Sequence, residues 1–414
     1  MKKFLGLFLL TANAIVAQAI PHINQIELEA KVDSIIASGI AQKAFPGAQV
    51  LLYKKGEIVL HKAYGHHTYN QEVAVDQEHL YDLASVTKIL ASTLAFMKLY
   101  ELYPINLDQK VSAFMPQLKN TNKEHSTFRA ILSHGAGWLP YLTHQQKIYR
   151  KNGSFRWHSL SQKQSKRYPM PLNDVLYVHK NYPKKIARRI KRTPVENVGQ
   201  YRYSGLWFFL LPEMVRQLSG LSFDEFLNTH YYAPMGLERI GFIPQKKFPK
   251  NEIVPSERDS LFRKELVQGW VHDEAAALMG GVSGNAGLFA NAQSIAPLLE
   301  MLLHQGQYKG KTYLNSETVA TFSRVANPGT DNRRGLGFDK PELIPPGNGR
   351  YPSAYSSASS FGHSGFTGTF VWVDPEHDCF VVFLSNRVYP SRAQRKLYEL
   401  GIRGALLDHV IQLH

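Results

Sequence analysis

A serine and a lysine stand three residues apart at the start of a long apolar run. The stretch YDLASVTKIL places Ser85 and Lys88 beside Ile89 and Leu90. On a helix, residues three apart are neighbours on one face, so the lysine amine can reach the serine hydroxyl. If the helix begins near Ala84, the serine lies in its first turn, where free backbone N–H groups favour developing negative charge.

A serine hydroxyl is a weak nucleophile until a base removes its proton. A lysine amine acts as that base only where burial or a neighbouring cation lowers its pKa, which is ordinarily about 10.4. Ser85 is the only serine of the chain that is followed by a lysine at the third position. The pair predicts a nucleophile and its base. On this motif alone, the alternative is a capping serine beside a lysine whose amine reaches solvent.

Two later segments carry further polar groups at suitable places. YRYSGLWFFLL contains Tyr203 in a Tyr-Ser-Gly triplet, and FGHSGFTGTFVW contains His363-Ser364-Gly365 at the start of an expected strand. In this order, the three elements resemble the serine β-lactamase and penicillin-binding-protein superfamily, in particular the branch of class C β-lactamases, D-alanyl-D-alanine carboxypeptidases and related esterases. The segments AILSHGAGW and HDEAAALMGGVSGNAGLFANA are also similar to that branch, the second to carboxypeptidases of the penicillin-binding-protein type 4B group.

The resemblance implies a role for each motif residue. Ser85 is implied as the acylated nucleophile, Lys88 as its base, and Tyr203 as the relay that moves a proton to the leaving group. On the strand, the resemblance implies that His363 stands where many members have lysine, that Ser364 is the following hydroxyl, and that Gly365 lets the strand edge approach the substrate. The backbone N–H groups of Ser85 and Phe366 are implied as the oxyanion hole, where losing one donor typically costs ~10²- to 10³-fold in rate.

Two departures from the family pattern affect substrate recognition. The third residue of the tyrosine motif is commonly asparagine or aspartate, which contacts the acylamino side of a substrate, and here it is Gly205. This change counts against an efficient β-lactamase. A histidine at position 363 is only partly charged near neutral pH if its pKa is ordinary, so we expect it to hold a substrate carboxylate less firmly than lysine does.

The elements that position these residues come from both ends of the chain. Ile26 to Ala41 has helical periodicity, and two strands, about Ala48 to Tyr53 and Glu57 to Tyr64, flank the Lys54-Lys55-Gly56 turn. Two more β-rich runs surround the Asp374-Pro375-Glu376 turn, and Arg392 to Leu413 is again helical in pattern. These patterns predict an α+β fold of the β-lactamase/transpeptidase type, with an antiparallel sheet built from both termini, flanking helices and a large helical region between.

The N-terminus has the composition of an export signal. Lys2 and Lys3 precede an apolar stretch from Phe4 to about Val16, and Ala17-Gln18-Ala19 is a small-x-small cleavage site. We therefore expect a signal peptide over residues 1–19, cleavage after Ala19, one hydrolase domain over residues 20–414, and a periplasmic or secreted protein. An uncleaved anchor is the alternative, but the run is shorter than the ~20 residues that span a bilayer.

The positive charge is concentrated in one segment. The chain has a net charge of +15, and residues 139–200 contain fourteen Lys and Arg against Asp174 and Glu196. We interpret this segment as a basic insertion within the helical region. Its densest part, YPKKIARRIKRTP, is either a solvated helix or a surface that leans on an anionic cell envelope. The cations concerned are Lys184, Lys185, Arg188, Arg189, Lys191 and Arg192; nucleic acid is a poor partner for an exported protein.

Other chemistries find little support. The single cysteine, Cys379, lies in an apolar run and excludes an intramolecular disulfide. No His-Glu-x-x-His or Gly-x-Ser-x-Gly motif occurs, and His272-Asp273-Glu274 lacks a second histidine one turn away, so we expect no metal and no cofactor. That triplet is expected to order a loop under the active site.

The predicted function is an exported serine hydrolase acting through an acyl-enzyme on Ser85. D-amino-acid peptides or cell-wall fragments are the first choice of substrate, and an ester or a β-lactam is the alternative within the same fold. From another class, a non-catalytic binding protein could retain the pocket, although such a protein needs no base beside its serine.

Overall fold

The chain folds around a five-stranded antiparallel sheet with helices on both faces, in a computed structural model that describes residues 25–342 and 351–413. The predicted signal peptide lies outside the described residues. The strand order is β13-β14-β15-β1-β2. The strands are β1 (Gly47–Lys54), β2 (Glu57–Gly65), β13 (Phe361–Ser364), β14 (Phe370–Asp374) and β15 (Cys379–Ser385). The prediction of one antiparallel sheet built from both termini is confirmed.

The centre of this sheet joins the two ends of the chain directly. Strand β1 pairs with β15 over the whole register from Ala48↔Ser385 to Lys54↔Cys379, and on its other side it forms the predicted hairpin with β2. Every residue of β1, β14 and β15 is buried, because both faces of the sheet are covered. Val, Phe and Leu dominate these strands, as expected where a pleated surface is packed on both sides.

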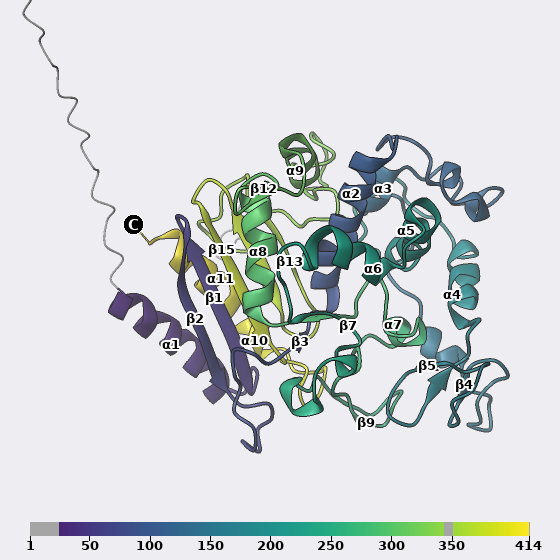
Figure 1. Cartoon of the computed structure of the whole chain (residues 1–414), viewed down its shortest axis with the longest axis horizontal. Helices are drawn as coiled ribbons and strands as arrows, with labels where there is room; N and C mark the ends of the chain where they lie inside the picture. The colour runs from purple at the N-terminus through teal and green to yellow at the C-terminus, as the bar shows by residue number, and fades with distance from the viewer. Residues whose placement is uncertain (1–24, 343–350, 414) are drawn as a thin grey trace, which may run out of the picture.

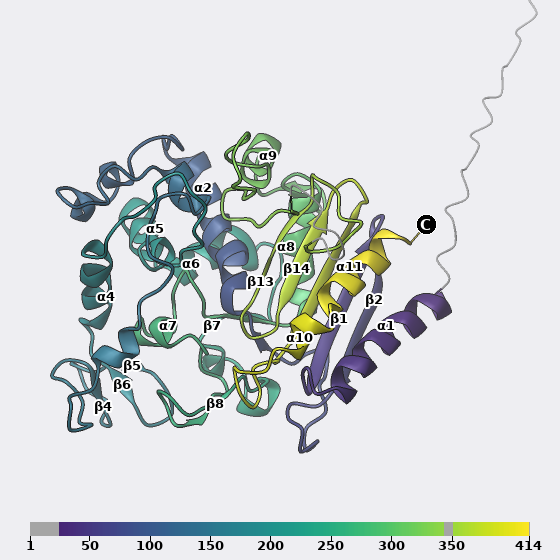
Figure 2. The same ribbon diagram turned by 180° about the vertical axis from the view of Figure 1, so that it is seen from behind.

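Helices form a layer on each face of the sheet. Helices α1 (Gln25–Ala41) and α11 (Ile402–Ile411) cover one face, and α8 (Ala292–Leu303) crosses the other, as Figure 1 and Figure 2 show from opposite sides. The prediction for α1 is confirmed. The prediction of one helix from Arg392 to Leu413 is wrong, because Gly401 adopts φ 61° and separates α10 (Lys396–Glu399) from α11.

The remaining residues form the predicted helical region beside the sheet, on the face that α8 covers (Figure 1). A small sheet of order β3-β10-β7 lies between the two parts. Among the described residues, no helix is both long enough and apolar enough to cross a membrane. The elements of this region are β3 (Tyr81–Asp82), α2 (Leu94–Leu102), α3 (Phe128–Leu132), α5 (Leu211–Ser219), α6 (Phe223–Leu227), β7 (Ile240–Phe242), β8 (Arg258–Asp259), β9 (Glu265–Leu266), α7 (Glu274–Leu278), β10 (Leu288–Ala290), β11 (Gln307–Tyr308), β12 (Lys311–Thr312) and α9 (Ser316–Ser323).

The basic segment, residues 139–200, packs at the end of the molecule far from α1 (Figure 1). It contains a short 3₁₀ turn, a three-stranded sheet of order β4-β6-β5 and one helix. These elements are η5 (His144–Lys147), β4 (Leu160–Ser161), β5 (Met170–Pro171), β6 (Tyr177–Val178) and α4 (Tyr182–Lys191).

Candidate active site

A cleft of about 530 Å³ opens where the helical region meets the edge of the main sheet. Ser85 and Lys88 line it from the helical side, and Phe366 lines it from the loop after β13. Tyr203, Gly205 and Asn285 also line it. The structure therefore brings together Ser85, Tyr203 and Phe366, and the first and last of these are more than 280 residues apart in the sequence.

Ser85 is presented by a tight and strained piece of backbone. It lies in the 3₁₀ turn η1 (Ala84–Val86), which continues into a π-helical segment, η2 (Lys88–Thr93), and then into α2. Ala84 has φ 45°, a left-handed conformation that residues other than glycine adopt at a cost. π-helical turns and such outliers are frequent at functional sites. Because Ser85 lies in the first turn, its backbone N–H faces no intrahelical acceptor.

Lys88 is buried and is held against the serine. Its Nζ donates to Ser85 Oγ at 2.9 Å and to the backbone carbonyl of Asn285 at 2.8 Å. The Tyr203 ring centroid lies 5.5 Å from the same nitrogen, at cation–π distance. The predicted serine, lysine and tyrosine are thus neighbours around the Lys88 Nζ atom.

Asp82 ties this segment to the opposite wall. Its carboxylate accepts the Ala84 N–H at 2.8 Å and the His272 N–H at 2.6 Å. Burial raises the pKa of Asp82, and these two backbone hydrogen bonds lower it in part. We infer a structural role, because the carboxylate fixes the backbone on both sides of the cleft without lining it.

Gly365 allows the sheet edge to approach the serine segment closely. A Cβ at this position would overlap Thr369 Oγ1 and would lie 2.6 Å from the Leu83 carbonyl. Thr369 Oγ1 donates to that same carbonyl at 2.9 Å, which locks the two segments together. The next residue, Phe366, presents a backbone N–H that donates to no other group in the described part of the chain. This amide and that of Ser85 are therefore available to an oxyanion, as the resemblance implies.

His363 does not line the cleft. Its ring is buried, with Nδ1 2.8 Å from the Ser364 carbonyl and Nε2 3.3 Å from Arg334 Nη2. Because the carbonyl only accepts, the proton lies on Nδ1, and Nε2 accepts from Arg334. Burial, then Arg334 and Lys88, lowers the pKa of His363 to about 3. The expectation of a partly charged histidine is replaced by a neutral one.

Arg334 is a buried cation that no sequence motif indicated. Its Nη1 pairs with Asp339 Oδ1 at 2.8 Å, and its Cζ lies 5.4 Å from the Tyr203 ring centroid. Burial alone would raise the pKa of Asp339, but Arg334 and Arg333 lower it to about 2. The guanidinium also lies 3.1 Å from the Nε2 of His134, a buried histidine whose pKa is well below its ordinary value, first through burial and then through Arg334.

The His272-Asp273-Glu274 triplet also lines the cleft. His272 Nε2 lies 2.8 Å from Glu257 Oε2, and Arg392 bridges Glu257 at 2.6 Å and Glu274 at 2.9 Å. Burial would raise the pKa of Glu257, but hydrogen bonds from His272 and Arg392 lower it to about 2. Asp273 accepts the Ala276 N–H and so caps α7. The triplet therefore forms a charged wall, a role that the sequence did not indicate.

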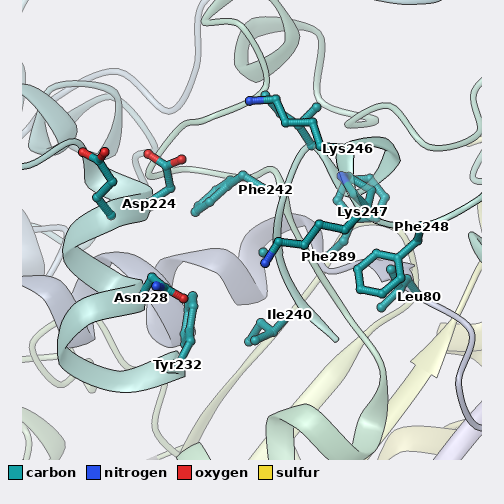
Figure 3. A pocket seen from close by; sticks show the side chains of 14 residues that line it. Leu80, Asp224, Asn228, Tyr232, Ile240, Phe242, Lys246, Lys247, Phe248 and Phe289 are labelled. Atoms are coloured by element: carbon teal, nitrogen blue, oxygen red, sulfur yellow. The ribbon is translucent and has the colours of Figure 1, made fainter. Parts of the chain in front are cut away.

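A second cavity, of about 240 Å³, lies apart from these residues. Figure 3 shows Lys246 and Lys247 on one side of it, Asp224 and Asn228 on the other, and Phe242 among the apolar side chains between them. It contains none of the predicted catalytic residues. No group of three or more His, Cys, Asp or Glu side chains in residues 25–342 and 351–413 is arranged to hold a metal ion.

Comparison with known proteins identifies the family of the chain. A model of the Beta-lactamase family matches residues 32–403. The chain belongs to the Beta-lactamase family. It is 28% identical to a protein of Bacillus subtilis (strain 168) named N-acetylmuramyl-L-alanine amidase, over 86% of this chain and 80% of the relative. It is 30% identical to a protein of Escherichia coli (strain K12) named as a D-alanyl-D-alanine carboxypeptidase, over 83% of this chain and 79% of the relative.

Solved structures share the fold of this chain at low sequence identity. A penicillin-binding-protein homologue from Caulobacter crescentus superposes with a TM-score of 0.65 at 18% identity, covering 92% of this chain and 96% of that one. EstCE1, described as a hydrolase with promiscuous acyltransferase activity, superposes with a TM-score of 0.66 at 19% identity, covering 92% of this chain and 99% of that one. The predicted fold and the predicted superfamily are confirmed, and the roles of the site residues stay predictions.

Proposed function

We propose that this member of the Beta-lactamase family is an exported serine hydrolase that forms an acyl-enzyme on Ser85 and cleaves an amide of a cell-wall peptide. The observation that carries the proposal is the 2.9 Å contact between Lys88 Nζ and Ser85 Oγ at the floor of an open cleft. A nucleophile within hydrogen-bond reach of a base is the arrangement that acyl transfer requires. Export is supported by the predicted signal peptide and by relatives named as cell-wall enzymes.

In the proposed first step, Ser85 Oγ attacks the substrate carbonyl and passes its proton to Lys88 as the C–O bond forms. The Asn285 carbonyl holds the lysine amine in place through its 2.8 Å hydrogen bond. The oxyanion lies between the amides of Ser85 and Phe366. Tyr203 then relays the proton to the departing amine, and the C–N bond breaks.

In the second step, a water molecule attacks the acyl-enzyme carbonyl and gives up its proton to the same lysine and tyrosine. The ester bond to Ser85 Oγ breaks, the hydroxyl regains a proton, and the acid product leaves. The alternative acceptor is an amine or alcohol, which converts hydrolysis into transfer.

A D-amino-acid peptide is the preferred substrate, in line with the relatives named as D-alanyl-D-alanine carboxypeptidases. A second candidate is the amide between a muramyl lactyl group and L-alanine. The Bacillus subtilis relative is named for that bond, and the space beside Gly205 favours a bulky acyl group, because a Cβ there would have only the Pro140 carbonyl nearby, at 3.8 Å. Esters and β-lactams remain the alternatives that the test below separates.

The test is a time course of intact mass for the mature protein with a penicillin, alongside the Ser85→Ala variant. A persistent adduct that depends on Ser85 supports a penicillin-binding peptidase, and an adduct that forms and clears quickly supports a β-lactamase. Assays with a D-alanyl-D-alanine peptide, a muramyl peptide and an aryl ester identify the acyl donor. Full turnover by Ser85→Ala would refute the mechanism, and no turnover of any substrate by the unchanged protein would favour a binding protein.

A further inference from the structure

The basic segment, residues 139–200, carries cations that the protein does not neutralise. Both acidic side chains of the segment form ion pairs with cations outside it: Asp174 with Lys250 at 2.8 Å, and Glu196 with Arg202 at 2.9 Å. None of its fourteen Lys and Arg side chains forms an ion pair with a carboxylate within the residues that the structure describes. The segment therefore presents a strong positive potential, which the attraction between Lys184 and the Glu213 carboxylate offsets only in part.

Helix α4 arranges part of this charge in a row. Tyr182, Ile186 and Ile190 are buried and attach the helix to the protein. Lys184, Arg188 and Arg192 are exposed at intervals of four residues, so their Cα atoms are about 6 Å apart along the axis. None of these three side chains donates a hydrogen bond to another group among residues 25–342 and 351–413. We call this row the α4 basic row.

The α4 basic row belongs to the same segment as one wall of the cleft. Tyr182 Oη donates to the His144 carbonyl at 3.3 Å and joins α4 to η5. Gln145 of η5 and Tyr141, which is 74% exposed, line the cleft that contains Ser85. A long molecule that lies on the row can therefore extend into the cleft. Figure 1 shows α4 and α7 in the same part of the molecule.

The burial of the apolar side of α4 indicates whether the exposed side binds a lipid bilayer or a hydrated anionic polymer. A helix that lies in a bilayer interface inserts an apolar face among the lipids. In α4 that face is already covered by the protein, so the exposed side offers charge alone. This favours a hydrated polymer with repeated anionic groups over a lipid bilayer.

We propose that the α4 basic row is a docking surface for the glycan–peptide polymer of the cell wall, through the carboxylates of its peptides. The proposal rests on the proposed function, because a polymer on the row is also the molecule that delivers a peptide to Ser85. The α4 basic row binds the polymer electrostatically, and the cleft determines which bond of the polymer is cleaved.

The test uses the mature full-length chain and sacculi from which phosphate-containing polymers have been removed. In the variant Lys184→Gln/Arg188→Gln/Arg192→Gln, binding in a sedimentation assay is expected to weaken by ~100-fold, from roughly five-fold per cation near an anionic surface. Binding by the unchanged protein is expected to fall steeply between low and high salt. The matched control is Lys31→Gln/Lys246→Gln/Lys311→Gln, which removes three exposed cations outside the segment and is expected to bind as the unchanged protein does.

Turnover separates this proposal from the proposed function. The α4 variant is expected to process a small soluble substrate at the unchanged rate and sacculi at a reduced rate, whereas Ser85→Ala is expected to bind sacculi normally and to process nothing. Equal binding by the α4 variant and the unchanged protein would overturn the docking surface. Equal losses in the α4 variant and the control, or tighter binding to phosphatidylglycerol vesicles or polyphosphate than to sacculi, would overturn it too. Full activity of Ser85→Ala would refute only the proposed function.

Discussion

Replacing His363 by glutamine should make the protein less sensitive to acid. The His363 ring is buried with a pKa of about 3, whereas a histidine in an unfolded chain has a pKa of about 6.5. Protons therefore bind the unfolded state more readily. The contribution to stability is complete above pH 6.5 and is lost as the pH falls toward 3. Between pH 7 and pH 5 this one group removes about 2 kcal/mol from the free energy of unfolding.

The assay is urea unfolding of the unchanged protein and of the His363→Gln variant at pH 7 and at pH 5. The quantity compared is the decrease in the free energy of unfolding between the two pH values. Glutamine keeps an acceptor for Arg334, and any constant cost of the substitution cancels in the difference. The other buried histidines, such as His67 and His144, contribute equally in both proteins. The variant is expected to lose about 2 kcal/mol less than the unchanged protein. Identical losses would refute the neutral, buried imidazole; replacing the exposed His125 by glutamine is the control.

Two further substitutions test the geometry of the site. Lys88→Met is expected to lower kcat/KM by at least ~10²-fold, the usual contribution of a general base, with Tm changed little, and a rate near that of the unchanged protein would contradict the role of the lysine. Gly365→Ala is expected to lower both activity and the free energy of unfolding, the latter by about 1–3 kcal/mol, because its Cβ would overlap Thr369 and crowd the Leu83 carbonyl. Urea unfolding measures the stability of this variant, and substrate turnover measures its activity. A Gly365→Ala variant that is both as stable and as active as the unchanged protein would show that the strand edge can move away from Ser85.

The sequence was sufficient where short-range patterns decide structure. The β-rich runs of β1 and β2 flank a short turn, and this pattern identifies a tight hairpin. In the structure, Lys55 and Gly56 of this turn both have left-handed φ angles. The spacing of Ser85 and Lys88 brings them together as soon as the backbone turns helically. One antiparallel sheet built from both termini was predicted because both ends of the chain carry β-rich runs around short turns, whereas the direct pairing of β1 with β15 emerges only from the structure.

The sequence was insufficient where a contact depends on distant segments. Arg334 and Asp339 come from a stretch without regular periodicity, and nothing local indicates that their ion pair reaches His363 or the Tyr203 ring. The long helix predicted at the C-terminus failed because a pattern of apolar spacing does not reveal the single left-handed residue, Gly401. A tertiary partner and one backbone angle were the missing information in these cases.

The charges around the cleft bear on how an anionic substrate would reach Ser85 past the basic segment, residues 139–200. Arg392 is committed to Glu257 and Glu274, and Arg334 is committed to Asp339 behind the neutral His363. Lys88 also lines the cleft and has no carboxylate partner among the described residues; its hydrogen bonds go to Ser85 and to the Asn285 carbonyl. A peptide carboxylate thus meets little free positive charge inside the cleft. The cations without a carboxylate partner lie instead along residues 139–200, so under the proposed docking we expect long-range attraction to bring such a substrate to this segment before it reaches Ser85.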